Sequence, residues 1–165
     1  MRELCSAVSR ECSKYGYEPV MLTDQLCCQA KEAGSFLASI AKTHCKSGKK
    51  LAYIAGGETV VNITGHGKGG RNQEIALSAA EGIKGMSNAA VFSIGSDGTD
   101  GPTDAAGGYS DGDTAGVLKN KGIDIFEVLK NNDAYNALKL TEGLIITGPT
   151  GTNVNDVAVL LIDCD

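Results

Sequence analysis

The chain has 165 residues, of which 42% are hydrophobic and 21% charged, a composition that excludes intrinsic disorder and fits one domain of ordinary size. Its formal net charge is −5, aromatic residues make up 5% of it, and it has no basic stripe, which argues against nucleic-acid binding. No apolar run could cross a bilayer and the first 15 residues lack the apolar core of a signal peptide, so we expect a cytoplasmic protein without membrane contact.

Hydrophobic periodicity predicts alternating helices and strands in the first part of the chain. Residues 3–15 and 28–45 each place apolar side chains on one helical face, and the short run 17–22 between them is typical of a strand. Two β-like runs follow, 51–55 and 59–64. Only three residues separate them, which predicts a tight hairpin or a bent strand with a bulge.

The second part continues the alternation. We expect a helix at about 71–81, a buried strand at 89–94, and then three short helices and two strands, at 112–121, 124–130, 133–139, 144–147 and 157–162. Strands interleaved with helices indicate the α/β class, and we predict a layered α/β/α domain with a mixed, mostly parallel sheet. The polar loops each follow the end of a predicted strand, where ligands of open α/β sheets bind.

A glycine-rich segment, GHGKGG at 65–70, precedes the helix predicted at 71–81. It formally satisfies G-x-G-x-x-G, but residues 82–96 contain no acid to bind a ribose, so dinucleotide binding is disfavoured. Unpaired N–H groups at a helix N-terminus favour an anion instead. Arg71 strengthens this interpretation, because a cation in the first helical turn opposes the macrodipole and needs a compensating partner. The alternative is an exposed arginine that caps a neighbouring loop.

Two further motifs carry carboxylates. Glu58 follows two glycines at a strand junction, where it could orient Arg71, help to bind a metal, act as a base, or lie in solvent. Asp97, Asp100 and Asp104 lie within eight residues, at a spacing that does not fit an EF-hand. They could share a magnesium ion or hydrogen-bond a polyol, or they could form Asx turns and a helix cap.

The last polar motif runs from Gly148 to Asp156, between two predicted strands. Its hydroxyl and amide side chains suit the binding of a sugar acid or a phosphate group. A structural turn is the alternative, although nine polar or small residues are long for a mere connection.

In this order and spacing, the four motifs resemble the carboxyl-terminal (MOFRL) domain of the glycerate 2-kinase family. The matching stretches are GGETVV, G-x-G-x-GGRNQE, SDGTDGPTDAAGG, ND-x-Y and TGPTGTNVND, at 56–61, 65–74, 96–108, 132–135 and 147–156. On this basis residues 1–50 are a helix–strand–helix segment that leads into a MOFRL-like domain, 51–165. The resemblance implies ATP-dependent phosphorylation of D-glycerate at its 2-hydroxyl group. Family members are also named hydroxypyruvate reductase, but the incomplete dinucleotide fingerprint argues against hydride transfer.

The resemblance also implies a larger amino-terminal kinase domain as a partner, so this chain would supply half of an interdomain active site and be inactive alone. Glu58 and Arg71 match functional positions of the family and are the predicted catalytic residues. The predicted substrate- and phosphate-binding residues are Gly69, Gly70, Asn72, Thr150, Thr152 and Asn153, with Asp97 and Asp100 near the Mg²⁺ that accompanies ATP. A non-catalytic anion-binding or regulatory module and a reductase remain as alternatives, and the oligomeric state stays open.

Overall fold

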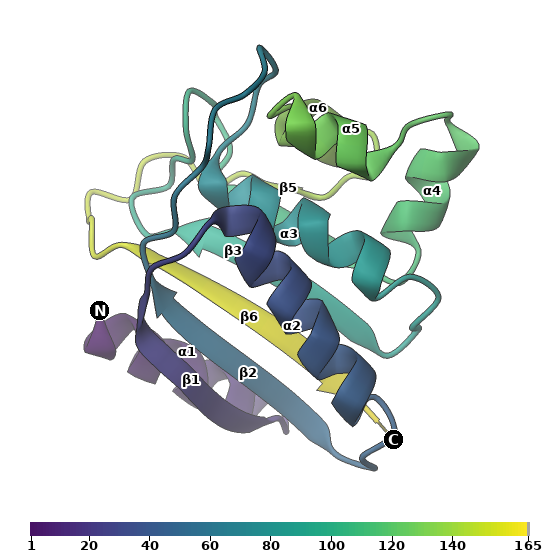
Figure 1. The fold of residues 1–165 in the computed structure, drawn as a ribbon. Coiled ribbons are helices and arrows are strands. Elements are labelled where there is room, and N and C mark those ends of the chain that lie inside the picture. Colours follow the sequence, from purple (N-terminus) through teal and green to yellow (C-terminus); the bar gives the residue numbers. More distant parts are fainter. Residues whose placement is uncertain (165) are drawn as a thin grey trace.

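The fold is built on one six-stranded sheet. The computed structural model describes residues 1–164, and the strand order of the sheet is β1-β2-β6-β3-β4-β5 (Figure 1). The strands are β1 (Glu18–Leu26), β2 (Lys50–Gly57), β3 (Ala89–Gly95), β4 (Gly107–Asp111), β5 (Leu144–Ile145) and β6 (Asp156–Asp163). β2 and β6 are buried along nearly their whole length, as their continuous apolar sequences predict.

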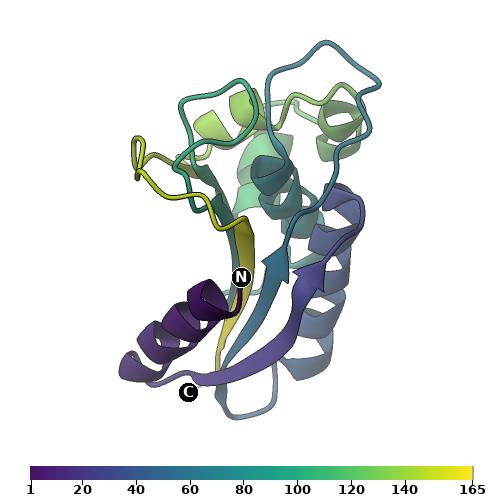
Figure 2. The ribbon, with the colours of Figure 1, turned by 90° about the vertical axis from the view of Figure 1, so that its left-hand side faces the viewer.

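Helices cover both faces of the sheet. α1 (Arg2–Lys14) packs on β1 and β2 from one side, whereas α2 (Ala30–His44) and α3 (Arg71–Gly82) pack together on the other side (Figure 2). Three short helices pack against α3: α4 (Thr114–Asn120), α5 (Ile125–Lys130) and α6 (Ala134–Lys139). The predicted α/β/α layering is therefore confirmed. Within residues 1–164, no helix has the length and apolar character needed to cross a membrane.

The strand directions correct one expectation. The sheet is mixed, as predicted, but it is not mostly parallel. In the part of the chain that the structure describes, β1–β2 is the one parallel pair and the other four pairs are antiparallel. The crossover through α3 does leave β2 and β3 pointing the same way. They are not neighbours, however, because β6 inserts between them in the opposite direction. Strand–helix alternation predicts the direction of β1 to β3, but it cannot predict where the last strand inserts.

The main apolar core lies between the sheet and helices α2 and α3. On α2, the buried side chains of Ala30, Ala33, Leu37, Ala38 and Ala41 form the stripe that the helical periodicity predicts. Gly34 lets α3 approach closely, because a Cβ atom at this position would collide with Ser78 Oγ and the carbonyl oxygen of Ile75. A second cluster fills the space between the sheet and α1, and a third lies under the short helices.

Most predicted elements are confirmed within a few residues, but one predicted strand is wrong and one observed strand was not predicted. Residues 59–64 form no strand and make a single bridge, from Val60 to Gln29, so the junction at 56–58 is neither a hairpin nor a bulge within one strand. β4 was not expected, because its sequence GGYSD is typical of a loop. Gly107 is required there by close packing, since a Cβ atom would collide with the carbonyl oxygen of Ser93 on β3.

Candidate functional site

Three segments meet at one edge of the sheet. β2 and β3 end there at Gly57 and Gly95, and the antiparallel β6 begins between them at Asp156. The loops after β2 and β3, together with the first turn of α3, enclose a cleft of about 590 Å³. Its lining includes five of the predicted site residues, Gly69, Gly70, Arg71, Asp97 and Asp100.

Arg71 lies in the wall of this cleft between two carboxylates. Its Nε and Nη2 atoms donate to the two carboxylate oxygens of Asp156, at 2.5 and 3.3 Å, and Nη1 donates to Glu58 Oε1 at 2.7 Å. Burial opposes the charge of the guanidinium, but the hydrogen bonds and charges of Asp156 and Glu58 outweigh it, so the pKa of Arg71 is raised. The predicted contact of Glu58 with Arg71 is present. Three of the five guanidinium N–H groups are used in this way, and within residues 1–164 the other two have no partner and remain for a ligand.

Asp156 is one of two carboxylates at this site that the sequence analysis did not single out. It was placed at the end of the 148–156 loop, without a role. The structure puts its side chain, 9% exposed, directly against Arg71, because β6 starts at the edge where β2 and β3 end. Burial raises the pKa of Asp156, and Arg71 opposes that rise. The clue in the sequence is a carboxylate immediately before a strand that is apolar on both faces.

The glycine-rich loop turns most of its backbone N–H groups away from any ligand. All five N–H groups of residues 64–68 donate to the segment 131–133, at distances of 2.8 to 3.2 Å. Gly65 and Gly67 are required because a Cβ atom at either position would collide with this segment. The amides of the first two glycines in the G-x-G-x-x-G pattern are therefore not available to a pyrophosphate, which agrees with the sequence-based argument against dinucleotide binding.

The amides that remain unpaired are the next three along the chain. Among residues 1–164, no hydrogen bond uses the backbone N–H of Gly69, Gly70 or Arg71. All three residues line the cleft. Unpaired N–H groups beside a guanidinium group are the donors that a carboxylate or phosphate oxygen needs.

The next N–H groups of helix α3 are capped from within the protein. Asp100 accepts hydrogen bonds from the backbone N–H groups of Asn72 and Gln73, at 3.1 and 2.8 Å, and from Asn72 Nδ2 at 3.3 Å. Burial raises the pKa of Asp100 to about 6, against the opposing effect of these hydrogen bonds. Gly70 has no room for a Cβ atom because Asp100 lies against it. Of the roles left open for Asp100, the structure shows the helix cap.

Asn72 lies behind the cleft wall rather than on it. The residue is 1% exposed, and its Oδ1 atom accepts a hydrogen bond from Ser93 Oγ at 2.5 Å while Nδ2 donates to Asp100. These contacts connect helix α3 to strand β3. They give Asn72 a structural function, and its predicted role in binding a ligand stays a prediction.

Asp97 occupies the loop after β3, where its Oδ1 atom accepts hydrogen bonds from the N–H and hydroxyl groups of Thr99, at 2.9 and 3.1 Å. Its Oδ2 atom makes no such contact within the described chain. Because both oxygens of Asp100 accept hydrogen bonds, Asp97 is the better placed of the two predicted magnesium ligands. Residues 1–164 contain no group of three or more His, Cys, Asp or Glu side chains arranged to hold a metal ion.

The predicted ligand-binding residues of the 148–156 loop contact a neighbouring loop. The hydroxyl groups of Thr150 and Thr152 both donate to the carbonyl oxygen of Ser96, at 2.5 and 3.2 Å, and Asn153 Oδ1 accepts from Asn155 N at 3.4 Å. None of the three belongs to the lining of the cleft beside Arg71. Thr150 and Thr152 hold the loop after β3, whereas among residues 1–164 the side chain of Asn153 makes hydrogen bonds only within its own loop. The predicted contact of all three with substrate stays a prediction.

Glu74 is a further carboxylate in the cleft that the sequence analysis overlooked. It follows Arg71 by one helical turn, is 4% exposed, and accepts a hydrogen bond from Asn132 Nδ2 at 2.9 Å. Burial raises its pKa, and the hydrogen bond from Asn132 opposes the rise. The signal in the sequence was an acid one turn into a helix that begins at a candidate site.

This fold and this site define an α/β domain that presents an arginine, held between two carboxylates, beside unpaired backbone amides. The sequence profile of the MOFRL family matches residues 51–156. The chain belongs to the MOFRL family. Residues 1–50 lie outside that match, yet β1 and α2 share the sheet and the main core with the rest of the chain.

Named relatives and solved structures agree with this assignment. The chain is 50% identical, over 98% of its length, to the D-glycerate 2-kinase of Thermotoga maritima, and 45% identical over 96% to the glycerate 2-kinase of Pyrococcus horikoshii. The crystal structure of the Thermotoga maritima glycerate kinase superposes with a TM-score of 0.94, and that of a Pyrococcus horikoshii protein with 0.91. The chain spans 37 to 40% of the length of these relatives, and 98% of it is covered in both superpositions.

Proposed function

We propose that this chain supplies one side of the active site of an ATP-dependent glycerate 2-kinase, which converts D-glycerate and ATP to 2-phosphoglycerate and ADP. The observation that carries the proposal is Arg71, fixed by Glu58 and Asp156 next to the unpaired N–H groups of Gly69 and Gly70. Both substrates are anions, and both reacting groups carry oxygens that such donors bind. The relatives named as glycerate kinases support the choice of substrate.

Phosphoryl transfer requires mainly positioning and charge stabilisation from a protein. In the proposed site the two remaining N–H groups of Arg71, together with the amides of Gly69 and Gly70, hold either the glycerate carboxylate or the transferring phosphoryl group. Glu58 and Asp156 keep the guanidinium in one orientation, so little freedom is lost when the ligand binds. Asp97 faces the Mg²⁺ that ATP brings as part of the substrate.

The proposed site also needs residues from outside this chain. Relatives are about two and a half times as long, since the chain covers 40% of the Thermotoga maritima kinase. We propose that the additional part provides the rest of the ATP site, and that this chain alone does not turn over.

Release of ADP in a coupled assay, with D-glycerate and ATP, tests the proposal. We expect activity from the chain joined to the additional part that its relatives carry, and none from the chain alone. Arg71→Ala should lower kcat/KM at least 100-fold, and Arg71→Lys should restore little, because an ammonium group cannot contact both carboxylates in the same way. Arg10→Ala, on the exposed surface of α1, is the matched control. Unchanged turnover in Arg71→Ala would refute the role of Arg71, and turnover by the chain alone would refute the need for a partner.

A further inference from the structure

Asn132 connects the glycine-rich loop to helix α3 at the back of the cleft. Its Oδ1 atom accepts hydrogen bonds from the N–H groups of Thr64 and Gly65, at 2.8 and 2.9 Å. Its Nδ2 atom donates to the carbonyl oxygen of Asn62 at 3.1 Å and to Glu74 Oε1 at 2.9 Å. An asparagine side chain offers two acceptor and two donor positions, and all four are used here.

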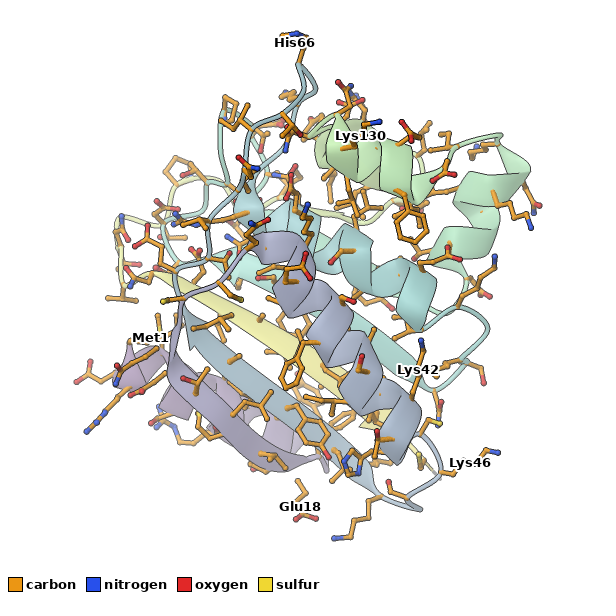
Figure 3. The ribbon with its side chains drawn as sticks, in the orientation of Figure 1. Met1, Glu18, Lys42, Lys46, His66 and Lys130 are labelled. Carbon is orange, nitrogen blue, oxygen red and sulfur yellow. The ribbon has the colours of Figure 1, made fainter. Side chains whose placement is uncertain are left out.

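The backbone at Asn132 is adapted to this task. Its φ angle is +56°, in the left-handed region that asparagine tolerates better than most residues. Asn132 lies between the end of α5 and the start of α6, and in this conformation its side chain reaches the glycine-rich loop. Figure 3 shows His66 at the tip of the glycine-rich loop, pointing away from the sheet, and Lys130 at the end of α5, near that loop.

Asn131 and Asp133, on either side of Asn132, also accept hydrogen bonds from the glycine-rich loop. Asn131 accepts from the N–H groups of His66 and Gly67, through its side chain and its carbonyl oxygen respectively, and Asp133 Oδ1 accepts from Lys68 N. The loop is therefore held residue by residue until Lys68. Only Asn132, however, also reaches a carboxylate inside the cleft.

The hydrogen bond to Glu74 connects Asn132 to the candidate site. It lies one helical turn after Arg71, on the same side of α3, and both residues line the cleft. A buried carboxylate needs a hydrogen-bond donor, and Asn132 Nδ2 provides one. A single side chain thus fixes both the carboxylate in the first turns of α3 and the loop that leads into Gly69 and Gly70.

We propose that Asn132 is a positioning residue of the kinase site: it holds the glycine-rich loop against Glu74, and thereby sets where the N–H groups of Gly69 and Gly70 lie relative to Arg71. This inference rests on the proposed function for its effect on catalysis. The arrangement itself can be tested without any kinase activity.

Amide hydrogen exchange tests the arrangement. Asn132→Gly removes the side chain but keeps a residue that adopts a positive φ without strain, so its effect is not one of backbone conformation. We expect exchange at residues 64 and 65 to accelerate at least 10-fold, with little change in the core strands β2 and β6. Glu142→Gly is the matched control, because Glu142 also has a positive φ, of 57°, but lies between α6 and β5 and does not line the cleft. Unchanged exchange at 64 and 65 in Asn132→Gly would overturn the proposal.

The hydrogen bond between Asn132 and Glu74 can be tested by reversing which of the two side chains donates and which accepts. Asn132→Asp keeps the acceptor for Thr64 and Gly65 but places a carboxylate oxygen against Glu74. Glu74→Gln keeps an acceptor for Asn132. In the double variant, a glutamine N–H can donate to the new aspartate. We expect Asn132→Asp to accelerate exchange at 64 and 65, and the double variant to recover at least part of the protection. Absence of any recovery would refute the pairing.

The catalytic consequence is measured in the complete kinase by the ADP-release assay. Asn132→Asp should raise the KM at least 10-fold with a smaller fall in kcat, and the double variant should lower that KM again. An unchanged KM alongside accelerated exchange would overturn the link from loop position to substrate binding. If the complete kinase without substitutions released no ADP with glycerate, the proposed function would fail, while the exchange data would still decide whether Asn132 holds the loop.

Discussion

The pH dependence of stability should reveal the ionisation state of Asp100. This carboxyl group is 3% exposed and has a folded-state pKa raised from 3.8 to about 6 by burial. A carboxyl group with a raised pKa favours the folded state when it is protonated, so its contribution is complete below about pH 3 and is lost as the pH rises from about 4 through 6. The difference between 3.8 and about 6 corresponds to roughly 3 kcal/mol.

The measurement compares the unmodified protein with Asp100→Asn, by urea unfolding at intervals from pH 4 to pH 7.5. Asparagine retains an acceptor for the first turn of α3 and does not titrate. The free energy of unfolding of the unmodified protein, minus that of the variant, should fall by about 2.5 kcal/mol across this range, because about 0.5 kcal/mol is already lost at pH 4. Asp97→Asn, in the same loop, is the control for general effects of charge. A difference that instead rises with pH would show that the helix N-terminus and its amides stabilise the ionised form more than burial destabilises it, and would refute the reasoning.

Three further substitutions test the packing and the site. Asp156→Asn should destabilise the protein by about 1–3 kcal/mol in thermal unfolding, since Arg71 loses a charged acceptor, and should lower kcat/KM of the complete kinase. A variant with the stability and the kcat/KM of the unmodified protein would contradict the position of Asp156. Gly34→Ala should cost about 1–3 kcal/mol despite the better helix propensity of alanine, because α2 and α3 would have to separate; a stabilised variant would contradict the close packing. Gly65→Ala should increase protease cleavage between residues 62 and 68, because a Cβ atom would collide with Asn131, and cleavage equal to that of the unmodified protein would contradict this contact.

The sequence predicted local structure better than long-range arrangement. The helices at 30–44 and 71–82 and the strand at 156–163 follow from periodicity and from continuous apolar runs, which are local properties. The run 59–64 resembles a strand by the same measure. It forms none, because Thr64 and Asn62 hydrogen-bond to the segment 130–132 instead of to another strand. Such a competing partner, more than 60 residues away, leaves no mark on the periodicity of the run itself.

The same dependence on distant partners explains which contacts of the candidate site could be predicted from the sequence. Glu58 and Arg71 are close in sequence and carry recognisable motifs, so their contact could be predicted. Asp156 could not, because its position depends on β6 inserting between β2 and β3, and the order of strands is decided by packing of the whole sheet. The hydroxyl-rich loop was predicted to bind a ligand from its composition. Composition could not show that Thr150 and Thr152 use their hydroxyl groups to hold the neighbouring loop.

The charge around Arg71 bears on what the proposed site needs. One guanidinium contacts two carboxylates, Glu58 and Asp156, so this cluster carries a net negative charge rather than a positive one. Asp97 and Glu74 add further carboxyl groups to the cleft wall, and glycerate and ATP are both anions. Arg71 and the amides of Gly69 and Gly70 can therefore orient an anion through directed hydrogen bonds, but they do not supply the attraction that brings it in. In the proposed kinase that attraction has to come from the Mg²⁺ bound to ATP and from cationic groups in the part that relatives carry beyond this chain, which is the physical reason to expect no turnover from the chain alone.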